Sequence, residues 1–350
     1  MATKGMMDMQ FVRIPRMTRL LDPREGYAEK TIDSEIRIDP LTGFSGRIAH
    51  FSTGPRRKVD LEALERASLV HGCPFCPDLL TQVTPKFPPD IEPMGRFYRG
   101  EATVFPNLSP YDAHSAVAVI SRAHLVSSSA FTAQQWEDAL AVSIDYFRAV
   151  HHAEQHIGYG LIGANYMPMA GASLLHPHMQ IYATERPGNW LQGQITASEN
   201  YYQSYRRIYW DDLLNTEKAN QVRYLGATGS VEWMVPFVPM SFIGDVEAIF
   251  PGRFTILELT TQDLRGFADG LVRILHYMAD TNIYSFNLGF YPGQSADDRT
   301  WVHARVSFRG TINPALNTPD VSVIRQLYDE PFTTIYPEDM AQQIRPYFQA

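Results

Sequence analysis

A pattern of strand, helix, strand and strand occurs twice in this sequence, about 127 residues apart, and it constrains the fold more than any other feature. In both helices apolar residues recur at spacings of three and four, among them Trp136 and Leu140 in the first and Leu271 and Leu275 in the second. Such a stripe predicts a helix that lies on a sheet. The expected elements are strands at 115–121, 158–166 and 173–184 with a helix at 132–152, then strands at 246–250, 285–291 and 301–308 with a helix at 261–279.

This repetition predicts one duplicated α+β fold rather than two unrelated domains. Neither copy supplies a complete sheet, so each is expected to contribute half of a mostly antiparallel one. Alignment of His176 with His303 places Arg305 at the position of His178, so we expect chemistry in the first copy alone. The predicted divisions are an N-terminal arm at 1–60, a first repeat at 61–190, a connector at 191–230 and a second, degenerate repeat at 231–350.

Composition narrows the function classes. The net charge is −8 and no long basic run occurs, so we expect no nucleic-acid partner. No segment approaches the ~20 apolar residues of a membrane span, and the N-terminal residues lack a signal-peptide core, so we expect no membrane association and a cytoplasmic location. Only two cysteines occur, as Cys73-Pro-Phe-Cys76, which excludes a disulfide scaffold and indicates metal or redox chemistry in a reducing compartment.

The segment 175–182, Leu-His-Pro-His-Met-Gln-Ile-Tyr, is the richest in chemistry. Successive side chains of a strand alternate between its faces, so His176, His178 and Gln180 are expected on one face and Met179 and Ile181 on the other. Three polar groups would then meet at one site. The alternative is a pair of surface histidines on an edge strand, which would also tolerate the proline between them.

A turn with small residues, Gly-Ala-Ser at 171–173, comes just before these histidines. Backbone N–H groups beside an imidazole suit a phosphoryl group. The combination resembles the galactose-1-phosphate uridylyltransferase family, a nucleotidyltransferase branch of the histidine-triad superfamily. The matching phrases, spread over nearly the whole chain, are DPLTG at 39–43, CPFCP at 73–77, FPN at 105–107, GANY and GASLLHPHMQ within 163–180, and PEDMAQQIR at 337–345.

The resemblance implies a duplicated histidine-triad-like fold, a half-barrel sheet with helices packed on one side. It also implies that His178 attacks the α-phosphorus of a nucleoside diphosphate compound to give a nucleotidyl-histidine, while the carbonyl of His176 holds the other ring nitrogen protonated. Gln180 stands where related hydrolases carry a third histidine. An amide can bind phosphoryl oxygens but cannot act as a general acid or base, which favours transfer over hydrolysis.

The same resemblance implies a substrate pocket and a reaction. Ser173 would contact the phosphates, Asn107 and Asn165 the nucleoside, and Phe75 and Phe105 the base. The reaction would be a ping-pong transfer of a nucleotide, UMP favoured, from a nucleoside diphosphate sugar to a phosphate or sugar-phosphate acceptor. The alternative enzyme is a phosphorylase or hydrolase of an adenylyl compound or dinucleotide that uses the same histidine. A third reading, a binding protein without activity, is disfavoured because His178, Gln180 and Ser173 are all present.

Cys73 and Cys76 can share one tetrahedral ion, but a closed site needs two more ligands. The resemblance supplies His124 and His176, which completes a site for one structural zinc ion; His114 is the competing ligand. A redox pair, or two small buried thiols, are the alternatives. We expect no organic cofactor, and because members of the family are commonly homodimers the resemblance implies a homodimer.

Overall fold

The computed structural model describes residues 9–49, 56, 58–313 and 318–349. Its central feature is a ten-stranded sheet in which all neighbouring strands run antiparallel. In spatial order the strands are β4 (Phe97–Arg99), β5 (Ala102–Pro106), β6 (His114–Val119), β8 (His178–Thr184), β7 (Tyr159–Tyr166), β12 (Ser285–Tyr291), β13 (His303–Arg309), β11 (Asp245–Ile249), β10 (Val231–Met234) and β9 (Tyr224–Thr228).

The two halves of this sheet have the same strand order. Read from the outer edge to the middle, the first half runs β4, β5, β6, β8, β7 and the second runs β9, β10, β11, β13, β12. The halves join where β7 pairs with β12, with Gly163 directly opposite Gly289. The predicted α+β class and the mostly antiparallel sheet are therefore confirmed.

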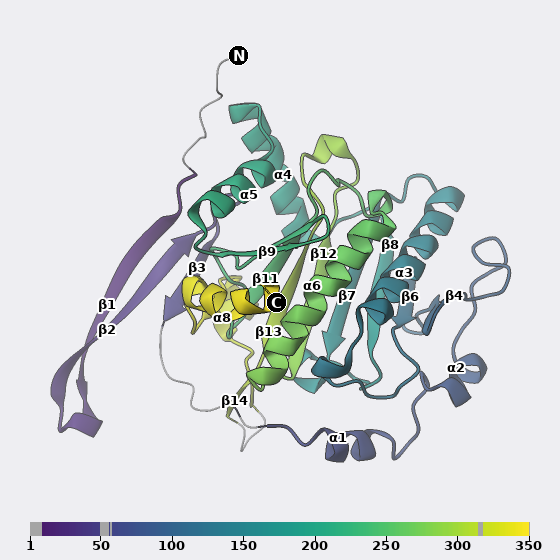
Figure 1. Cartoon of the computed structure of the whole chain (residues 1–350), viewed down its shortest axis with the longest axis horizontal. Coiled ribbons are helices and arrows are strands. Elements are labelled where there is room, and N and C mark those ends of the chain that lie inside the picture. Colours follow the sequence, from purple (N-terminus) through teal and green to yellow (C-terminus); the bar gives the residue numbers. More distant parts are fainter. Residues whose placement is uncertain (1–8, 50–55, 57, 314–317, 350) are drawn as a thin grey trace.

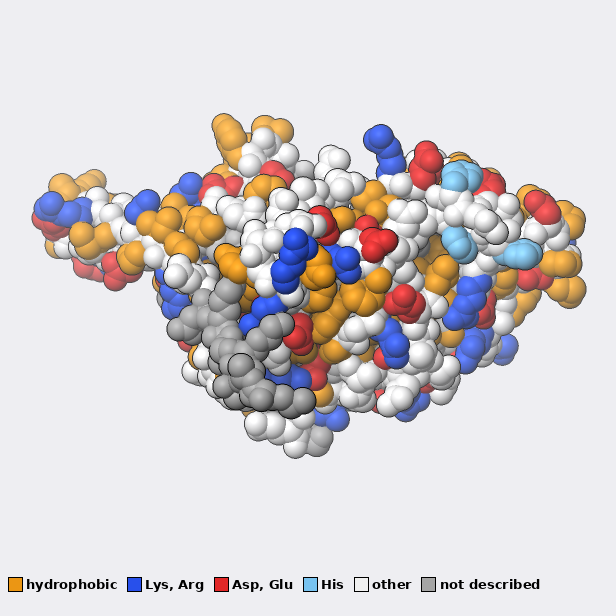
Figure 2. Space-filling view, turned by 90° about the horizontal axis from the view of Figure 1, so that it is seen from above, with side chains coloured by type: hydrophobic (Ala, Val, Ile, Leu, Met, Phe, Trp, Pro, Cys, Tyr) orange, Lys and Arg blue, Asp and Glu red, His pale blue; other side chains and the backbone are white. Residues whose placement is uncertain are grey.

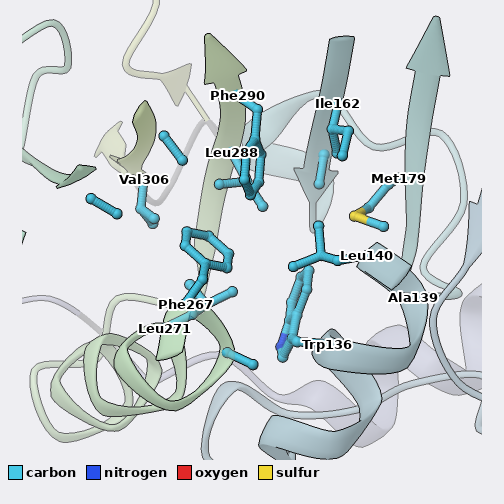
Figure 3. Packing of buried hydrophobic residues seen from close by; sticks show 14 of the residues in the cluster. Trp136, Ala139, Leu140, Ile162, Met179, Phe267, Leu271, Leu288, Phe290 and Val306 are labelled. Carbon is cyan, nitrogen blue, oxygen red and sulfur yellow. The ribbon is translucent and has the colours of Figure 1, made fainter. Parts of the chain in front are cut away.

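Two long helices, α3 (Ala133–Ala153) and α6 (Thr261–Asp280), lie side by side on one face of the sheet (Figure 1). A capping box, formed by Thr132 and Gln135, starts α3. Side chains of the two helices meet those of β7, β8, β12 and β13 in one core (Figure 3). Phe267 and Leu140 have no exposed surface, and burying each such side chain contributes about 1.5–3 kcal/mol.

The opposite face of the sheet differs between the halves. In the second half it is covered by α5 (Tyr209–Asn220), whose Trp210, Leu213 and Leu214 pack on Met234, Ile249 and Trp301. The expectation of helices on one side thus holds for α3 and α6, while α5 adds a second layer. Its buried aromatic and leucine side chains explain this layer, because they need an apolar surface of their own.

The hydrogen-bond register corrects the alignment of the two copies. The Nδ1 of His178 lies 2.8 Å from the carbonyl oxygen of His176, and the Nδ1 of His303 lies 3.0 Å from that of Trp301. His303 therefore takes the place of His178, not of His176, and Arg305 takes that of the residue two after His178. The equivalent strand pairs are Val119–His178 with Ile249–His303, and Gly163–Gln180 with Gly289–Arg305.

The N-terminal residues form an arm, defined here as the hairpin of β1 (Val12–Asp22) and β2 (Ala28–Ile38), which extends away from the body (Figures 1 and 2). At its base β2 pairs with β3 (Ser45–Ala49), and β3 with β16 (Phe332–Thr333). The other described elements are α1 (Leu61–Ser68), α2 (Pro77–Val83), α4 (Asn189–Tyr205), β14 (Thr311–Asn313), β15 (Thr318–Pro319), α7 (Val323–Tyr328) and α8 (Pro337–Gln349). None of the helices in the described part of the chain is long and apolar enough to span a membrane.

Candidate functional site

The strand expected at 173–184 begins only at His178. The preceding residues, 171–177, form a loop in which Gly171 has φ +88°. That left-handed backbone favours glycine and lets the chain turn sharply out of the short helix Pro168–Ala170. His178 and Gln180 share the face opposite the α3 core, as predicted, but His176 lies in the loop and is fully buried.

His178 is held in one orientation. Its Nδ1 donates to the carbonyl oxygen of His176 at 2.8 Å, and its ring meets the edge of Phe75 with 5.2 Å between ring centroids. Burial lowers the pKa of this imidazole, which outweighs the opposing effect of the carbonyl. The ring is therefore neutral near pH 7, and because Nδ1 carries the hydrogen, Nε2 carries the lone pair.

Gln180 follows on the same face, and its amide orientation is also set. The hydroxyl of Tyr182 donates to Oε1 of Gln180 at 2.6 Å. Since that oxygen is occupied, the Nε2 group of Gln180 is the end available to donate to a ligand. Tyr182 was not among the residues predicted from the sequence, although the period of two along β8 places it on this face.

The polar residues predicted around the substrate occupy three different elements. Ser173 is exposed in the loop 171–177, and Asn165 lies near the end of β7, the neighbour of β8. Asn107 lies just after β5. Its Oδ1 accepts a hydrogen bond from the backbone N–H of Ser109 at 3.0 Å and so stabilises the turn in which it lies. The seam residue Asn287 donates to Asn165 across the sheet; it was missed because only the pairing of β7 with β12 brings the two together.

The two phenylalanines pack against each other with ring centroids 5.5 Å apart. Phe105 is only 2% exposed and lies in an apolar cluster with Leu80 and Val117, so it forms the floor under Phe75. Phe75 is half-buried and lies between this cluster and His178. An aromatic ring in that place offers a surface on which a planar base can pack.

Cys73, Cys76, His124 and His176 converge beside the catalytic candidates. One ligand atom from each lies within 4.8 Å of all the others. The Cys76 Sγ is 3.5 Å from Nδ1 of His124, and the Cys73 Sγ is 3.6 Å from Nδ1 of His176. Bonds of about 2.3 Å to sulfur and 2.0 Å to nitrogen in a tetrahedron predict a sulfur–nitrogen separation of about 3.5 Å. The cluster could therefore hold one tetrahedral metal ion.

The surroundings of the cluster also fit a metal. The Nε2 of His176 donates to the carbonyl of Ser121 at 2.8 Å, which leaves the Nδ1 lone pair directed at the sulfurs. Burial and the neighbouring Cys73 raise the pKa of the Cys76 thiol to about 11, so two thiolates require a cation between them. The competing ligand His114 lies elsewhere and pairs with Glu154 at 3.1 Å.

No protein-family model matches the chain. A protein of Archaeoglobus fulgidus, described only as an uncharacterised protein, is 31% identical over 319 residues, which is 89% of this chain and 91% of the relative. Identity at this level over nearly the full length indicates a shared family.

Solved structures with the same fold are more distant in sequence. A GalT-like protein of Arabidopsis thaliana matches with a TM-score of 0.67 at 16% identity, covering 89% of this chain and 98% of the other. An ADP-glucose phosphorylase of Arabidopsis thaliana, solved with ADP-glucose bound, gives 0.66 at 17% identity with the same coverage. A structure described as uridylyltransferase gives 0.65 at 18% identity, covering 90% and 98%. The resemblance seen in the sequence is thus confirmed for the fold.

Proposed function

Because the chain belongs to one family with the Archaeoglobus fulgidus protein and has the GalT-like fold, we propose that it is a nucleotidyltransferase acting through a nucleotidyl-histidine on His178. The observation that carries the proposal is the state of His178. Its Nδ1 donates to a backbone carbonyl, which leaves the lone pair on Nε2, and the partly exposed ring follows directly after a small-residue loop. A neutral imidazole in this tautomer is a nucleophile that needs no separate base.

In the first half-reaction, Nε2 of His178 bonds to the α-phosphorus of a nucleoside diphosphate sugar. The bond from that phosphorus to the bridging oxygen breaks, and the sugar 1-phosphate leaves with the electron pair. Ser173 and the amide of Gln180 bind the phosphoryl oxygens, Asn107 and Asn165 bind the nucleoside side, and Phe75 over Phe105 packs against the base. The carbonyl of His176 stabilises the positive charge that develops on the ring.

In the second half-reaction, a phosphate oxygen of the acceptor attacks the same phosphorus and the bond to Nε2 breaks. The imidazole returns to its starting tautomer, so no net proton transfer by the protein is required. Gln180 supplies only hydrogen bonds, which favours a phosphate or sugar-phosphate acceptor over water. The donor is proposed to carry UMP. The second candidate is a phosphorylase of an adenylyl compound, favoured by the similarity to a fold solved with ADP-glucose.

We further propose that Cys73, Cys76, His124 and His176 hold zinc. Their donor atoms, spacing and buried setting match a closed tetrahedral site. When bound, the ion supplies structural stability rather than a reacting group, because no ligand position is left open for substrate. It would fix His176, and through the carbonyl of His176 the orientation of His178. A reducing, cytoplasmic setting would keep both thiols available.

The experiment is covalent labelling with α-³²P-labelled UDP-glucose, UDP-galactose, ADP-glucose and diadenosine tetraphosphate. We expect one donor to give an acid-labile adduct on wild-type protein, and His178→Gln to abolish it. The matched control is His303→Gln, which changes the equivalent histidine of the second half and should label at the wild-type rate. Labelling of His178→Gln, or no adduct with any donor, contradicts the proposal.

The isolated adduct then identifies the acceptor. The adduct is chased with inorganic phosphate, with water alone, or with a hexose 1-phosphate other than the one that the donor releases, since that one merely reverses the first half-reaction. Release as a new nucleoside diphosphate sugar indicates the sugar-phosphate transferase, release as a nucleoside diphosphate indicates the phosphorylase, and release in water alone at the same rate indicates a hydrolase.

We also propose that the chain forms a homodimer through its arm. The arm carries exposed apolar side chains, among them Met17 and Leu21 on β1, Tyr27 in the turn and Ile32 on β2. A two-stranded hairpin is marginally stable when it stands alone in water. Burial of this surface on a second copy would stabilise it. Sedimentation equilibrium should give twice the chain mass of 39.7 kDa for wild type and a monomer for Met17→Glu/Leu21→Glu. A monomeric wild type contradicts this.

A further inference from the structure

The side chain of Asn165 lies at the seam of the two halves and has one end engaged. Its Oδ1 accepts a hydrogen bond from Nδ2 of Asn287 at 2.7 Å, across β7 and β12. Its Nδ2 faces the loop 171–177, since the position of a Cβ on Gly171 would be 4.0 Å away. Within the described ranges, this Nδ2 has no hydrogen-bond acceptor.

Arg309 determines which end of the Asn287 amide faces Asn165. A guanidinium can only donate, and its Nη1 lies 2.9 Å from Oδ1 of Asn287. The Nδ2 of Asn287 must therefore point the other way. There it lies 2.9 Å from the carbonyl oxygen of Ala170, which can only accept. Two independent partners thus agree on which end of the Asn287 amide is the oxygen and which is the nitrogen. Without such partners the two ends could be exchanged.

Arg309 is itself held in place by the second half. Its Nε donates to Oδ1 of Asp320 at 2.7 Å, and Asp320 also accepts from the amide of Gly310 at 3.0 Å. Asp320 is 7% exposed as a residue, with a side chain that is 1% exposed. A charge-assisted pair at this depth keeps the guanidinium from turning, so the chain of contacts from Asp320 to Asn165 has one arrangement.

We propose that Asn287 and Arg309 are positioning residues that hold the Asn165 amide, assigned above to the nucleoside side of the substrate, with its N–H groups toward the loop 171–177, where the α-phosphoryl group joins that nucleoside. This rests on the proposed function. Reversal of the Asn165 amide would place an acceptor oxygen against phosphoryl oxygens, which repel it. The second half therefore takes part in the chemistry of the first, because it fixes which end of the Asn165 amide faces the substrate.

The test is Asn287→Asp, which keeps size and shape. The new carboxylate still accepts from Arg309 but has no N–H for Asn165, so the Asn165 amide turns to donate to it. We expect the rate of adduct formation from the donor that labels wild type to fall by about 10- to 100-fold, the usual range for a hydrogen bond to a charged group. Ser285→Ala is the matched control, because Ser285 also bonds across this seam, to the backbone carbonyl of Tyr166 rather than to the side chain of Asn165.

A double variant separates positioning from general damage. If Asn287 acts through Asn165, then Asn165→Ala/Asn287→Asp labels no more slowly than Asn165→Ala alone. A further loss in the double variant means that Asn287→Asp disturbs the loop through Ala170, and it overturns the proposal. Wild-type labelling by Asn287→Asp also overturns it while leaving the proposed function intact.

A spectroscopic readout makes the proposal independent of activity. The side-chain amide signals of Asn165, assigned by their loss in Asn165→Ala, are recorded by ¹⁵N–¹H NMR. In Asn287→Asp both proton signals should shift, one strongly downfield, as the amide takes up a bond to the carboxylate. Unchanged signals overturn the positioning role, even where no donor labels the protein and the proposed function itself has failed.

Discussion

At the scale of single residues, the orientation of two imidazoles decides what the cysteine cluster can bind. His176 gives its Nε2 hydrogen to Ser121, and the Nε2 of His124 lies 2.7 Å from the hydroxyl of Ser68. With Nε2 engaged as a donor, each ring presents the lone pair of Nδ1 to the sulfurs. Burial lowers the pKa of His176 to about 4, so this ring is neutral and able to ligate near pH 7.

Removal of one thiol should remove the metal. Purified wild type is expected to hold about one zinc ion per chain by atomic emission, and Cys73→Ser to hold well under a tenth of that, because three ligands bind far more weakly than four. Loss of the ion should lower the melting temperature markedly, since its binding energy contributes to folding. Cys73→Ser with a full complement of zinc contradicts the site.

The hydroxyl of Ser68, 2.7 Å from Nε2 of His124, allows a milder substitution to test the same site. Ser68→Ala leaves all four ligands in place but removes the group that orients one ring, so zinc should still bind, about 10- to 100-fold more weakly in a chelator competition. The control is Ser204→Ala, an exposed serine on α4 that bonds only to its own helix. Equal affinity in Ser68→Ala and Ser204→Ala would show that Ser68 does not orient the ligand.

At the scale of elements, α5 explains why the two halves differ although both carry a histidine at the same place. Trp210 stacks on His303 with 4.0 Å between ring centroids, and Tyr291 lies against it at 5.0 Å. His303 has no exposed surface. In the first half His178 keeps part of its surface exposed. In the described part of the chain no helix places an aromatic ring flat on it, and Phe75 meets it edge-on. A substrate could therefore reach one histidine and not the other without rearrangement of α5.

The long helices could be predicted from the sequence because periodicity and capping act locally. The stripe of α3 and its capping box at Thr132 need no knowledge of the rest of the chain. Strand boundaries were less predictable: Pro177 and the left-handed Gly171 delay β8 to His178. The alignment of the copies was wrong because spacing along the chain does not reveal register, which the hydrogen bonds between strands define.

The candidate site was predictable to a similar extent. Cys73 and Cys76 are close in sequence, whereas His124 came from the resemblance alone, and the structure brings it to them. Tyr182 could have been predicted, because side chains alternate along a strand and Tyr182 lies two residues after Gln180. Asn287 carried no local signal, because its contact with Asn165 depends on two halves meeting at β7 and β12.

At the scale of the whole molecule, one carboxylate joins the arm to the second half. Glu338 of α8 accepts from Arg13 of β1 at 2.8 Å, from Arg37 of β2 at 2.7 Å and from Arg223 at 3.0 Å. Arg37 has no exposed surface, and its guanidinium also lies 4.7 Å from the ring centre of Phe237. Because these arginines stay charged, loss of the Glu338 charge would remove one carboxylate from each of the buried Arg37 and Arg223, which would keep Glu35 and Glu217 as partners.

This connection makes the stability of the fold depend on pH. Burial would raise the pKa of Glu338, but the hydrogen bonds and charge of Arg37, with the charge of Arg13, outweigh it and lower the pKa from 4.5 to about 2. A lowered carboxyl pKa stabilises the fold above the unfolded value, near pH 4.5, and the contribution is lost as the pH falls toward 2. The shift corresponds to about 3 kcal/mol at most, of which about 2 kcal/mol has gone by pH 3.

Comparison of variants isolates this term from titrating groups that do not interact with Glu338; Glu217 is the exception, because the charge of Glu338 helps to raise its pKa. We expect Glu338→Gln to be less stable than wild type at pH 7 by up to about 3 kcal/mol, and the difference in urea unfolding free energy to narrow by about 2 kcal/mol at pH 3. Glu62→Gln, on the exposed face of α1, should follow wild type throughout. A gap that stays constant from pH 7 to pH 3 would mean that Glu338 titrates alike in the folded and unfolded chain, so that the three arginines fasten the arm by packing on Phe237 rather than by charge.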